Sequence, residues 1–223
     1  MADTHVLARV FHSSTALVAS LAVLLQLVLV VQGNAILDET DPPALATRVI
    51  RFFSYLTIWS NILVAVVSVV LTVRPDHDGR VWRAVRLDAV VICFGGGIVH
   101  FILLRPLLDL SGPDLLADRL LHVVVPLFAL VGWLAFGPRS RVQRADLGPF
   151  LVIPLCWLAY TLVRGAFVDW YPYPFIDAGE LGYAVVAVNA AVVSAFLLGL
   201  AALALWLDPH LPGVRSRQPA TQA

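Results

Sequence analysis

The stretch FFSYLTIWSNILVAVVSVVLTV, which runs from Phe52 to Val73, decides the fold class because it contains no charged residue. It is longer than the roughly 17 residues that a helix needs to cross the hydrocarbon core of a bilayer. In lipid every backbone polar group must find a partner inside the protein, and a single continuous segment can do this only as a helix. The stretch therefore predicts a transmembrane helix.

Five further apolar segments lie on either side of this stretch, and each is close to spanning length. The six predicted spans cover about residues 10–31, 52–73, 87–104, 120–136, 147–163 and 181–207. The first segment has only a weak basic start, His5 and Arg9, and a poor cleavage site at Gly33-Asn34-Ala35, so we expect it to be a span and not a signal peptide. Residues 1–208 are thus predicted to form one all-α membrane domain, and residues 209–223 a disordered cytoplasmic tail.

The composition agrees with a polytopic membrane protein and excludes several functions. Hydrophobic residues make up 60% of the chain and charged residues 13%, and the mean hydropathy is +0.86, whereas soluble domains are about 25% charged. The formal net charge is zero, so the chain has no basic surface for nucleic acid. All 15 basic residues are arginine, which excludes lysine Schiff-base chemistry. Neither cysteine has the spacing of a metal ligand, and we expect no metal and no cofactor.

The arginines predict the orientation, because cytoplasmic loops of membrane proteins are enriched in basic residues. The two termini and the loops on their side carry ten arginines, and the opposite side carries five: Arg48, Arg51, Arg105, Arg119 and Arg164. Both termini are therefore predicted to be cytoplasmic. An all-arginine chain rich in alanine, valine and leucine is typical of a GC-rich bacterial genome, so we expect the bacterial inner (plasma) membrane.

Polar side chains of three predicted spans fall in the same half of the membrane. Thr57 and Asn61 lie one turn apart near the outer end of the second span, His100 near the outer end of the third, and His122 near that of the fourth. Asp118 lies one turn above His122 on the same helix face. Polar groups within spans are costly and commonly functional, so these residues are the candidate site.

Proline and glycine predict where the helices adapt around this site. Pro126 has no N–H to donate to the carbonyl of His122, four residues back, so the helix is expected to loosen or kink there. The run Gly95-Gly96-Gly97 predicts a point where two helices pack closely.

The loop Trp170-Tyr171-Pro172-Tyr173-Pro174-Phe175-Ile176-Asp177 is the densest aromatic stretch outside the spans. One interpretation is an interfacial aromatic belt with a rigid turn. The other is a lid or entrance over the outer cavity, formed by Trp170, Tyr171, Tyr173, Phe175 and Asp177. One loop could serve both purposes.

Several of these features together resemble the androgen-induced gene and androgen-dependent TFPI-regulating proteins, a family of six-span membrane proteins. The resemblance rests on Tyr55-Leu56-Thr57-Ile58, Arg86-Leu87-Asp88, His122 followed by valines and Pro126, and the Trp170–Asp177 loop, in the same order along the chain. The family hydrolyses fatty acid esters of hydroxy fatty acids. The resemblance implies a membrane lipid ester as substrate, Thr57 as nucleophile and His122 as base.

The residues themselves are compatible with that chemistry. A histidine can take the proton of a threonine hydroxyl and return it to the leaving alcohol. Asp118 could orient the histidine, and Asn61 could donate to the developing oxyanion.

Other interpretations of the same residues stay open at this point. Thr57 could simply bond its own helix backbone, and His122 and His100 could be helix–helix hydrogen-bond partners. A transporter could relay protons through Asp88, His100 and His122, and a b-type haem protein could use the two histidines as axial ligands. A non-catalytic scaffold is the third alternative.

Overall fold

The structure is a computed structural model that describes residues 2–34, 43–139 and 142–211. The described residues form helices and no strand. Six helices are long and apolar enough to cross a membrane: Thr4–Gln32, Leu56–Val73, Arg80–Leu107, Gly112–Phe136, Arg144–Val168 and Tyr183–His210. The predicted all-α fold with six spans is confirmed. The first, third, fourth and fifth helices extend beyond the apolar segments that predicted them, because polar residues continue the helix past the apolar core.

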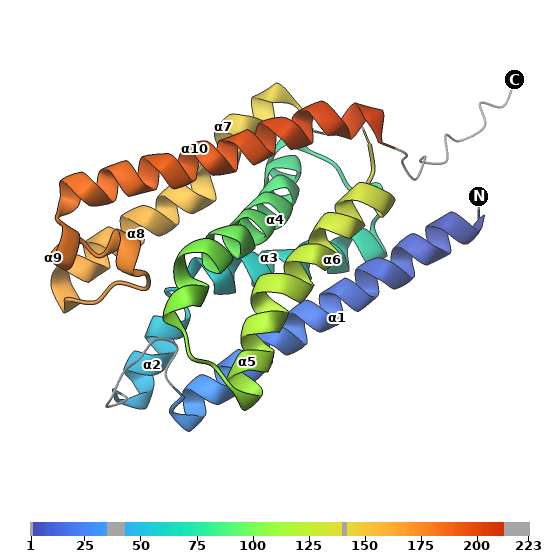
Figure 1. The fold of residues 1–223 in the computed structure, drawn as a ribbon. Coiled ribbons are helices and arrows are strands. Elements are labelled where there is room, and N and C mark those ends of the chain that lie inside the picture. Colours follow the sequence, from blue (N-terminus) through green and yellow to red (C-terminus); the bar gives the residue numbers. More distant parts are fainter. Residues whose placement is uncertain (1, 35–42, 140–141, 212–223) are drawn as a thin grey trace, which may run out of the picture.

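The spans are assembled from shorter elements (Figure 1). In chain order these are α1 (Ala2–Gln32), α2 (Leu45–Phe52), α3 (Leu56–Val73), α4 (Arg80–Val99), η1 (His100–Leu104), η2 (Arg105–Leu107), α5 (Gly112–Arg119), η3 (Leu120–Val124), α6 (Val125–Val131), η4 (Gly132–Phe136), η5 (Arg144–Asp146), α7 (Leu147–Phe150), α8 (Val152–Val168), η6 (Pro174–Ile176), α9 (Ala178–Leu181), α10 (Tyr183–Leu207) and η7 (Asp208–His210). Three of the short elements, η1, η3 and η4, are π-helical turns inside longer helices.

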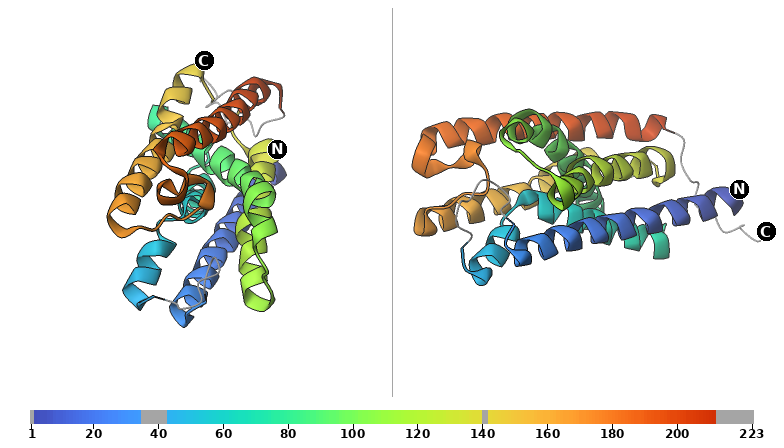
Figure 2. Two further views of the ribbon diagram at one scale, coloured as in Figure 1. Left: turned by 60° about the vertical axis from the view of Figure 1, so that its left-hand side comes forward. Right: turned by 60° about the horizontal axis from the view of Figure 1, so that its bottom comes forward.

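Helix α3 forms the centre of the bundle. It packs along α1 on one side and α4 on the other, and α4 in turn contacts α6 and α10. Helix α6 contacts both α1 and α4, and Figure 2 shows α10 on the side of the bundle opposite α1. The N-terminus and the end of α10 lie at the same end of the molecule, while α2, α5 and α9 lie at the opposite end. The candidate site lies toward that opposite end.

Two predictions at the ends of the spans were placed differently from the structure: the start of the second span and the start of the tail. The second span does not begin at Phe52: that residue ends α2, and α3 begins at Leu56. The predicted disordered tail began at residue 209, but the chain stays helical through His210. The remainder of that tail, residues 212–223, lies outside the described residues.

The glycine run in α4 is a close-packing point, as predicted. A Cβ atom on Gly95 would lie 2.6 Å from the Leu197 side chain of α10, and one on Gly97 would lie 2.6 Å from the carbonyl oxygen of His122. Real Cβ atoms do not approach other atoms this closely. Glycine at position 97 therefore allows α4 to lie directly against the backbone that carries His122.

We expect Gly97→Ala to destabilise the protein by about 1–3 kcal/mol, the usual effect of overpacking a tight contact, because the new methyl group meets backbone rather than a flexible side chain. Gly199→Ala in α10 is the matched control, since its Cβ has no neighbour within 4 Å. Thermal unfolding midpoints of the two variants in detergent provide the measurement. Equal midpoints for both variants would show that α4 does not approach His122 this closely.

Candidate functional site

Thr57 lies in the first turn of α3 because the chain breaks between α2 and α3. Tyr55 is extended, with φ −79° and ψ 128°, and α3 starts at the next residue. The first backbone N–H groups of a helix have no partner within the helix and carry a partial positive charge. The break therefore places the Thr57 hydroxyl beside a helix N-terminus.

Two tryptophans stabilise this break, which contains no proline or glycine. Trp59 donates its indole N–H to the carbonyl of Phe53 at 2.7 Å, and Trp157 donates to the carbonyl of Ser54 at 2.9 Å. Backbone carbonyls in an apolar environment require such partners. Ser54 itself donates its hydroxyl to the carbonyl of Ile50 and does not lie on α3. Ser54 therefore lies before α3 and not on the same helix as Thr57.

His122 lies on the π-helical turn η3, four residues before Pro126. In a π turn the N–H of each residue pairs with the carbonyl five residues back, and the N–H of Val125 accordingly donates to Leu120. The prediction that the helix loosens here is confirmed, but the register differs. In the π register the carbonyl that Pro126 leaves without a donor is that of Leu121, and the side-chain amide of Asn61 donates to it at 3.3 Å.

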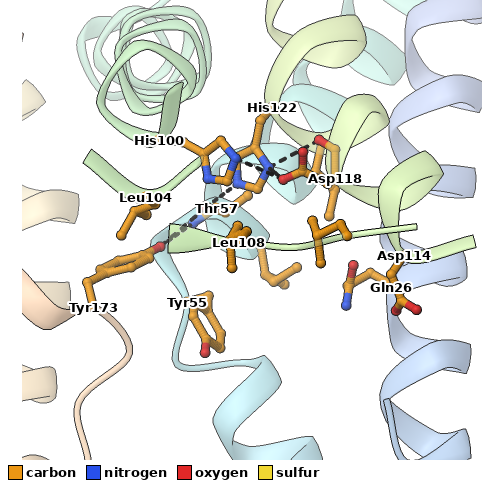
Figure 3. Close-up of a pocket in the computed structure, with 13 residues that line it drawn as sticks. Gln26, Tyr55, Thr57, His100, Leu104, Leu108, Asp114, Asp118, His122 and Tyr173 are labelled. Atoms are coloured by element: carbon orange, nitrogen blue, oxygen red, sulfur yellow. Dashed lines mark hydrogen bonds and ion pairs between the residues drawn. The ribbon is translucent and has the colours of Figure 1, made fainter. Parts of the chain in front are cut away.

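Thr57, His122 and Asp118 form a continuous chain of polar contacts (Figure 3). The Thr57 Oγ1 atom lies 3.3 Å from His122 Nε2, and His122 Nδ1 lies 3.0 Å from Asp118 Oδ1 and 3.1 Å from the Asp118 carbonyl oxygen. Both oxygens at Nδ1 are acceptors, so Nδ1 carries the hydrogen in the neutral ring and Nε2 presents its lone pair to the threonine. This arrangement matches the nucleophile, base and orienting acid of a catalytic triad.

His100 adds a second imidazole to the same carboxylate. Its Nε2 lies 2.8 Å from Asp118 Oδ1, and its ring stacks on that of His122 with centroids 3.5 Å apart and planes within 4°. The side chains of His100 and Asp118 are only 6% and 7% exposed. The haem interpretation requires a porphyrin between the two imidazoles, and this stacking leaves no room for one.

Tyr173 reaches Thr57 from the loop before α9 (Figure 3). Its hydroxyl accepts the backbone N–H of Thr57 at 3.3 Å and lies 3.3 Å from Thr57 Oγ1. Burial raises the pKa of the Tyr173 phenol above its ordinary value, so the hydroxyl keeps its proton at neutral pH and can donate it. The hydroxyl proton of Tyr173 is thus available beside the threonine oxygen.

Asn61 lies one turn below Thr57, as predicted, but its amide is used by the backbone. The Nδ2 atom donates to the Thr57 carbonyl at 2.8 Å as well as to Leu121. Both of its N–H groups therefore have acceptors. The structure makes Asn61 a link between α3 and η3 and offers no free amide hydrogen for an oxyanion.

The other residues of the aromatic loop hold it in place. Trp170 packs against Tyr55 and lies under the guanidinium groups of Arg51 and Arg164. Tyr171 fits against Gly165, where a Cβ would lie within 2.1 Å of its ring, and Asp177 caps α9 by accepting from the N–H groups of residues 179 and 180. Phe175 stacks on Tyr173. Of the five predicted lid residues, only Tyr173 and Phe175 line the two cavities beside Thr57.

Two cavities, each of about 70 Å³, meet at the site. Six residues line both of them: Thr57, His100, Leu104, Leu121, His122 and Tyr173. The first cavity extends toward Gln26 and Asp114, and the second extends toward Gly96 and Leu197 between α4 and α10. The site thus has room on both sides of the threonine hydroxyl, and both extensions are largely apolar.

Asp88 does not join this cluster. It is buried in α4, twelve residues before His100 and so about 18 Å away along the helix axis. A proton path through Asp88, His100 and His122 would need further groups between them.

Comparison of the chain with known protein families, characterised proteins and solved structures finds no match. The geometry of the site is therefore what bears on the function.

Proposed function

We propose that this protein is an integral membrane hydrolase of lipid (fatty acyl) esters, with Thr57 as nucleophile and His122 as general base. The observation that carries the proposal is the unbroken contact chain from Thr57 through both ring nitrogens of His122 to Asp118. A threonine hydroxyl is a weak nucleophile unless an adjacent base takes its proton. The resemblance to the androgen-induced gene family names the same two residues for the same roles.

The proposed reaction proceeds in two half-reactions. His122 Nε2 takes the Thr57 proton as Oγ1 attacks the ester carbonyl, and the resulting tetrahedral intermediate expels the alcohol, which receives that proton from His122. A water molecule, deprotonated by His122 in the same way, then attacks the acyl-threonine. The tetrahedral intermediate releases the fatty acid as His122 returns the proton to Thr57 Oγ1. Asp118 accepts the N–H of His122 Nδ1 throughout and stabilises the imidazolium.

The negative charge on the carbonyl oxygen is stabilised by groups other than Asn61. The Tyr173 hydroxyl and the N-terminal turn of α3 both lie next to Thr57, where the developing oxyanion would lie. A protonated phenol and the positive end of a helix are effective donors in a site with little water. We assign the oxyanion hydrogen bond to Tyr173, and the first turn of α3 contributes the positive partial charge of its helix end.

The two cavities support a lipid ester as the substrate. An ester has an acyl arm and an alcohol arm, and the cavities extend to either side of Thr57. Among the described residues no arginine lines either cavity, and Asp114 and Asp118 line the first, so neither cavity suits an anionic part of the substrate. Apolar walls with a few polar groups at one point are typical of sites that orient a reactive group within a hydrocarbon chain.

We further infer that the protein resides in the bacterial plasma membrane with both termini in the cytoplasm, as the arginine distribution favours. The site would then face the outer leaflet, and lipid esters could enter from the bilayer. Single cysteines at Ser111 and Asp76, two exposed positions at opposite ends of the bundle, test the orientation in intact cells. A membrane-impermeant maleimide should label position 111 and not 76; the reverse pattern would place the termini outside.

Thr57→Ala should abolish covalent labelling of the purified protein by a fluorophosphonate probe, and His122→Ala should reduce labelling to background, because an unactivated hydroxyl does not react. The probe should be found on Thr57 by peptide mapping. Thr72→Ala is the matched control, since Thr72 lies on the same helix and donates to the Ser68 carbonyl. It should label like the wild type.

A folded, monodisperse wild type that takes no label would contradict the threonine nucleophile. In that case substrate uptake into proteoliposomes would test the transporter alternative. If the protein shows neither uptake nor labelling, the scaffold interpretation remains.

Tyr173→Phe and Asn61→Ala should affect different properties: the first the labelling rate and the second the stability. Removal of the Tyr173 hydroxyl should lower the labelling rate by about 100-fold, the usual effect of losing one oxyanion donor, with little change in stability. Asn61→Ala should lower the free energy of unfolding by about 1–3 kcal/mol, because the Leu121 carbonyl loses the Asn61 donor and the Thr57 carbonyl keeps Ser60 but loses Asn61. Tyr171→Phe, in the same loop, is the control and should keep the wild-type rate. A rate loss with Asn61→Ala at unchanged stability would return the oxyanion role to Asn61.

A further inference from the structure

Ester hydrolysis does not require the second histidine of the cluster either as base or as orienting acid. A base and its orienting acid need one imidazole and one carboxylate, yet His100 comes from a different helix and contacts the same oxygen of Asp118 as His122 does. The three side chains are buried or nearly so, with exposed fractions of 6%, 7% and 15% for His100, Asp118 and His122. The second imidazole therefore indicates a further role for this cluster.

The composition is that of a transition-metal site. Two imidazole nitrogens and one carboxylate oxygen, all within 4.8 Å of one another, form the ligand set that zinc commonly takes when it keeps an open position. Ligand atoms around a tetrahedral ion with bonds of about 2.0–2.1 Å are separated by about 3.3 Å. His100 Nε2 and His122 Nδ1 lie 2.8 and 3.0 Å from Asp118 Oδ1, so the contacts need to open by only a few tenths of an ångström.

The surroundings allow an ion to reach the cluster and the rings to adjust. All three side chains line the first cavity, which extends to the polar groups of Gln26 and Asp114. Coordination requires the two stacked rings to tilt so that each lone pair points at the ion. Both histidines lie on π-helical turns, η1 and η3.

We propose that His100, Asp118 and His122 bind a divalent transition-metal ion of the zinc class, and that the bound ion inhibits the hydrolase. Metal binding depends only on the three ligands; inhibition rests on the function proposed above. When the ion occupies Nδ1 of a neutral imidazole, the ring hydrogen moves to Nε2. Nε2 of His122 then faces Thr57 as a donor and cannot take the threonine proton.

Cobalt(II) titration of the purified, chelator-treated protein tests binding independently of activity, because a tetrahedral cobalt site with nitrogen and oxygen ligands absorbs visible light. We expect saturation at one ion per chain, with zinc displacing cobalt. His100→Ala should weaken cobalt binding at least tenfold. His210→Ala is the matched control, since His210 is exposed at the end of α10, and it should bind like the wild type.

His100→Gln keeps a polar side chain and serves as a second variant in case His100→Ala does not fold. Thermal unfolding and size-exclusion profiles show whether each variant is folded. His100→Gln should weaken cobalt binding as His100→Ala does. Cobalt spectra that are the same in the wild type and both His100 variants, or no cobalt band in a folded wild type, would overturn the site.

Fluorophosphonate labelling of Thr57 with and without saturating zinc tests the inhibition. Labelling should fall at least tenfold with zinc and recover with chelator. Undiminished labelling of the zinc-loaded wild type would overturn the inhibitory role. Absence of labelling from metal-free protein would instead count against the proposed hydrolase, while the cobalt spectrum would still decide the metal site.

Discussion

A backbone inside a bilayer has to satisfy its own hydrogen bonds, and this requirement shapes the site. The chain leaves regular α-helical geometry between α2 and α3 and again in η3, and a side chain compensates at each point. Trp59 and Trp157 donate to the carbonyls of the break, and Asn61 donates to the Leu121 carbonyl within the π turn. The departures from regular helix bring the first turn of α3 and the imidazole of His122 to one cavity.

Close contacts between the helix backbones also position the residues of the site. Asn61 connects α3 to η3 through two carbonyls, and Gly97 lets α4 lie against the carbonyl of His122. The helices that carry the nucleophile, the base and the second histidine are therefore held together at the backbone, through the short Asn61 side chain and through a glycine. Such contacts hold the reacting groups close to the positions that the reaction needs.

The sequence predicts what depends on local pattern and misses what depends on distant partners. Six spans follow from apolar length alone, and the contact of Asp118 with His122 follows from their spacing of four residues on one helix. The break before Leu56 has no proline or glycine to indicate it, because one of its stabilising groups, Trp157, lies a hundred residues further on. Tyr173 was predicted in a lid, but only the packing of the loop determines that its hydroxyl, and not that of Tyr171, reaches Thr57.

The buried charge of Asp118 explains why the hydrolase and metal proposals converge on the same three residues. A carboxylate in a mostly apolar environment is costly unless several donors surround it, and here one oxygen faces an imidazole nitrogen from each of two helices. With both imidazoles in place, Asp118 can remain ionised and hold the tautomer of His122 that accepts a proton from Thr57. The same concentration of negative charge between two nitrogens attracts a divalent cation. Replacing His100 would therefore not simply remove a metal ligand; it would also take away one of the two groups that keep the orienting carboxylate charged.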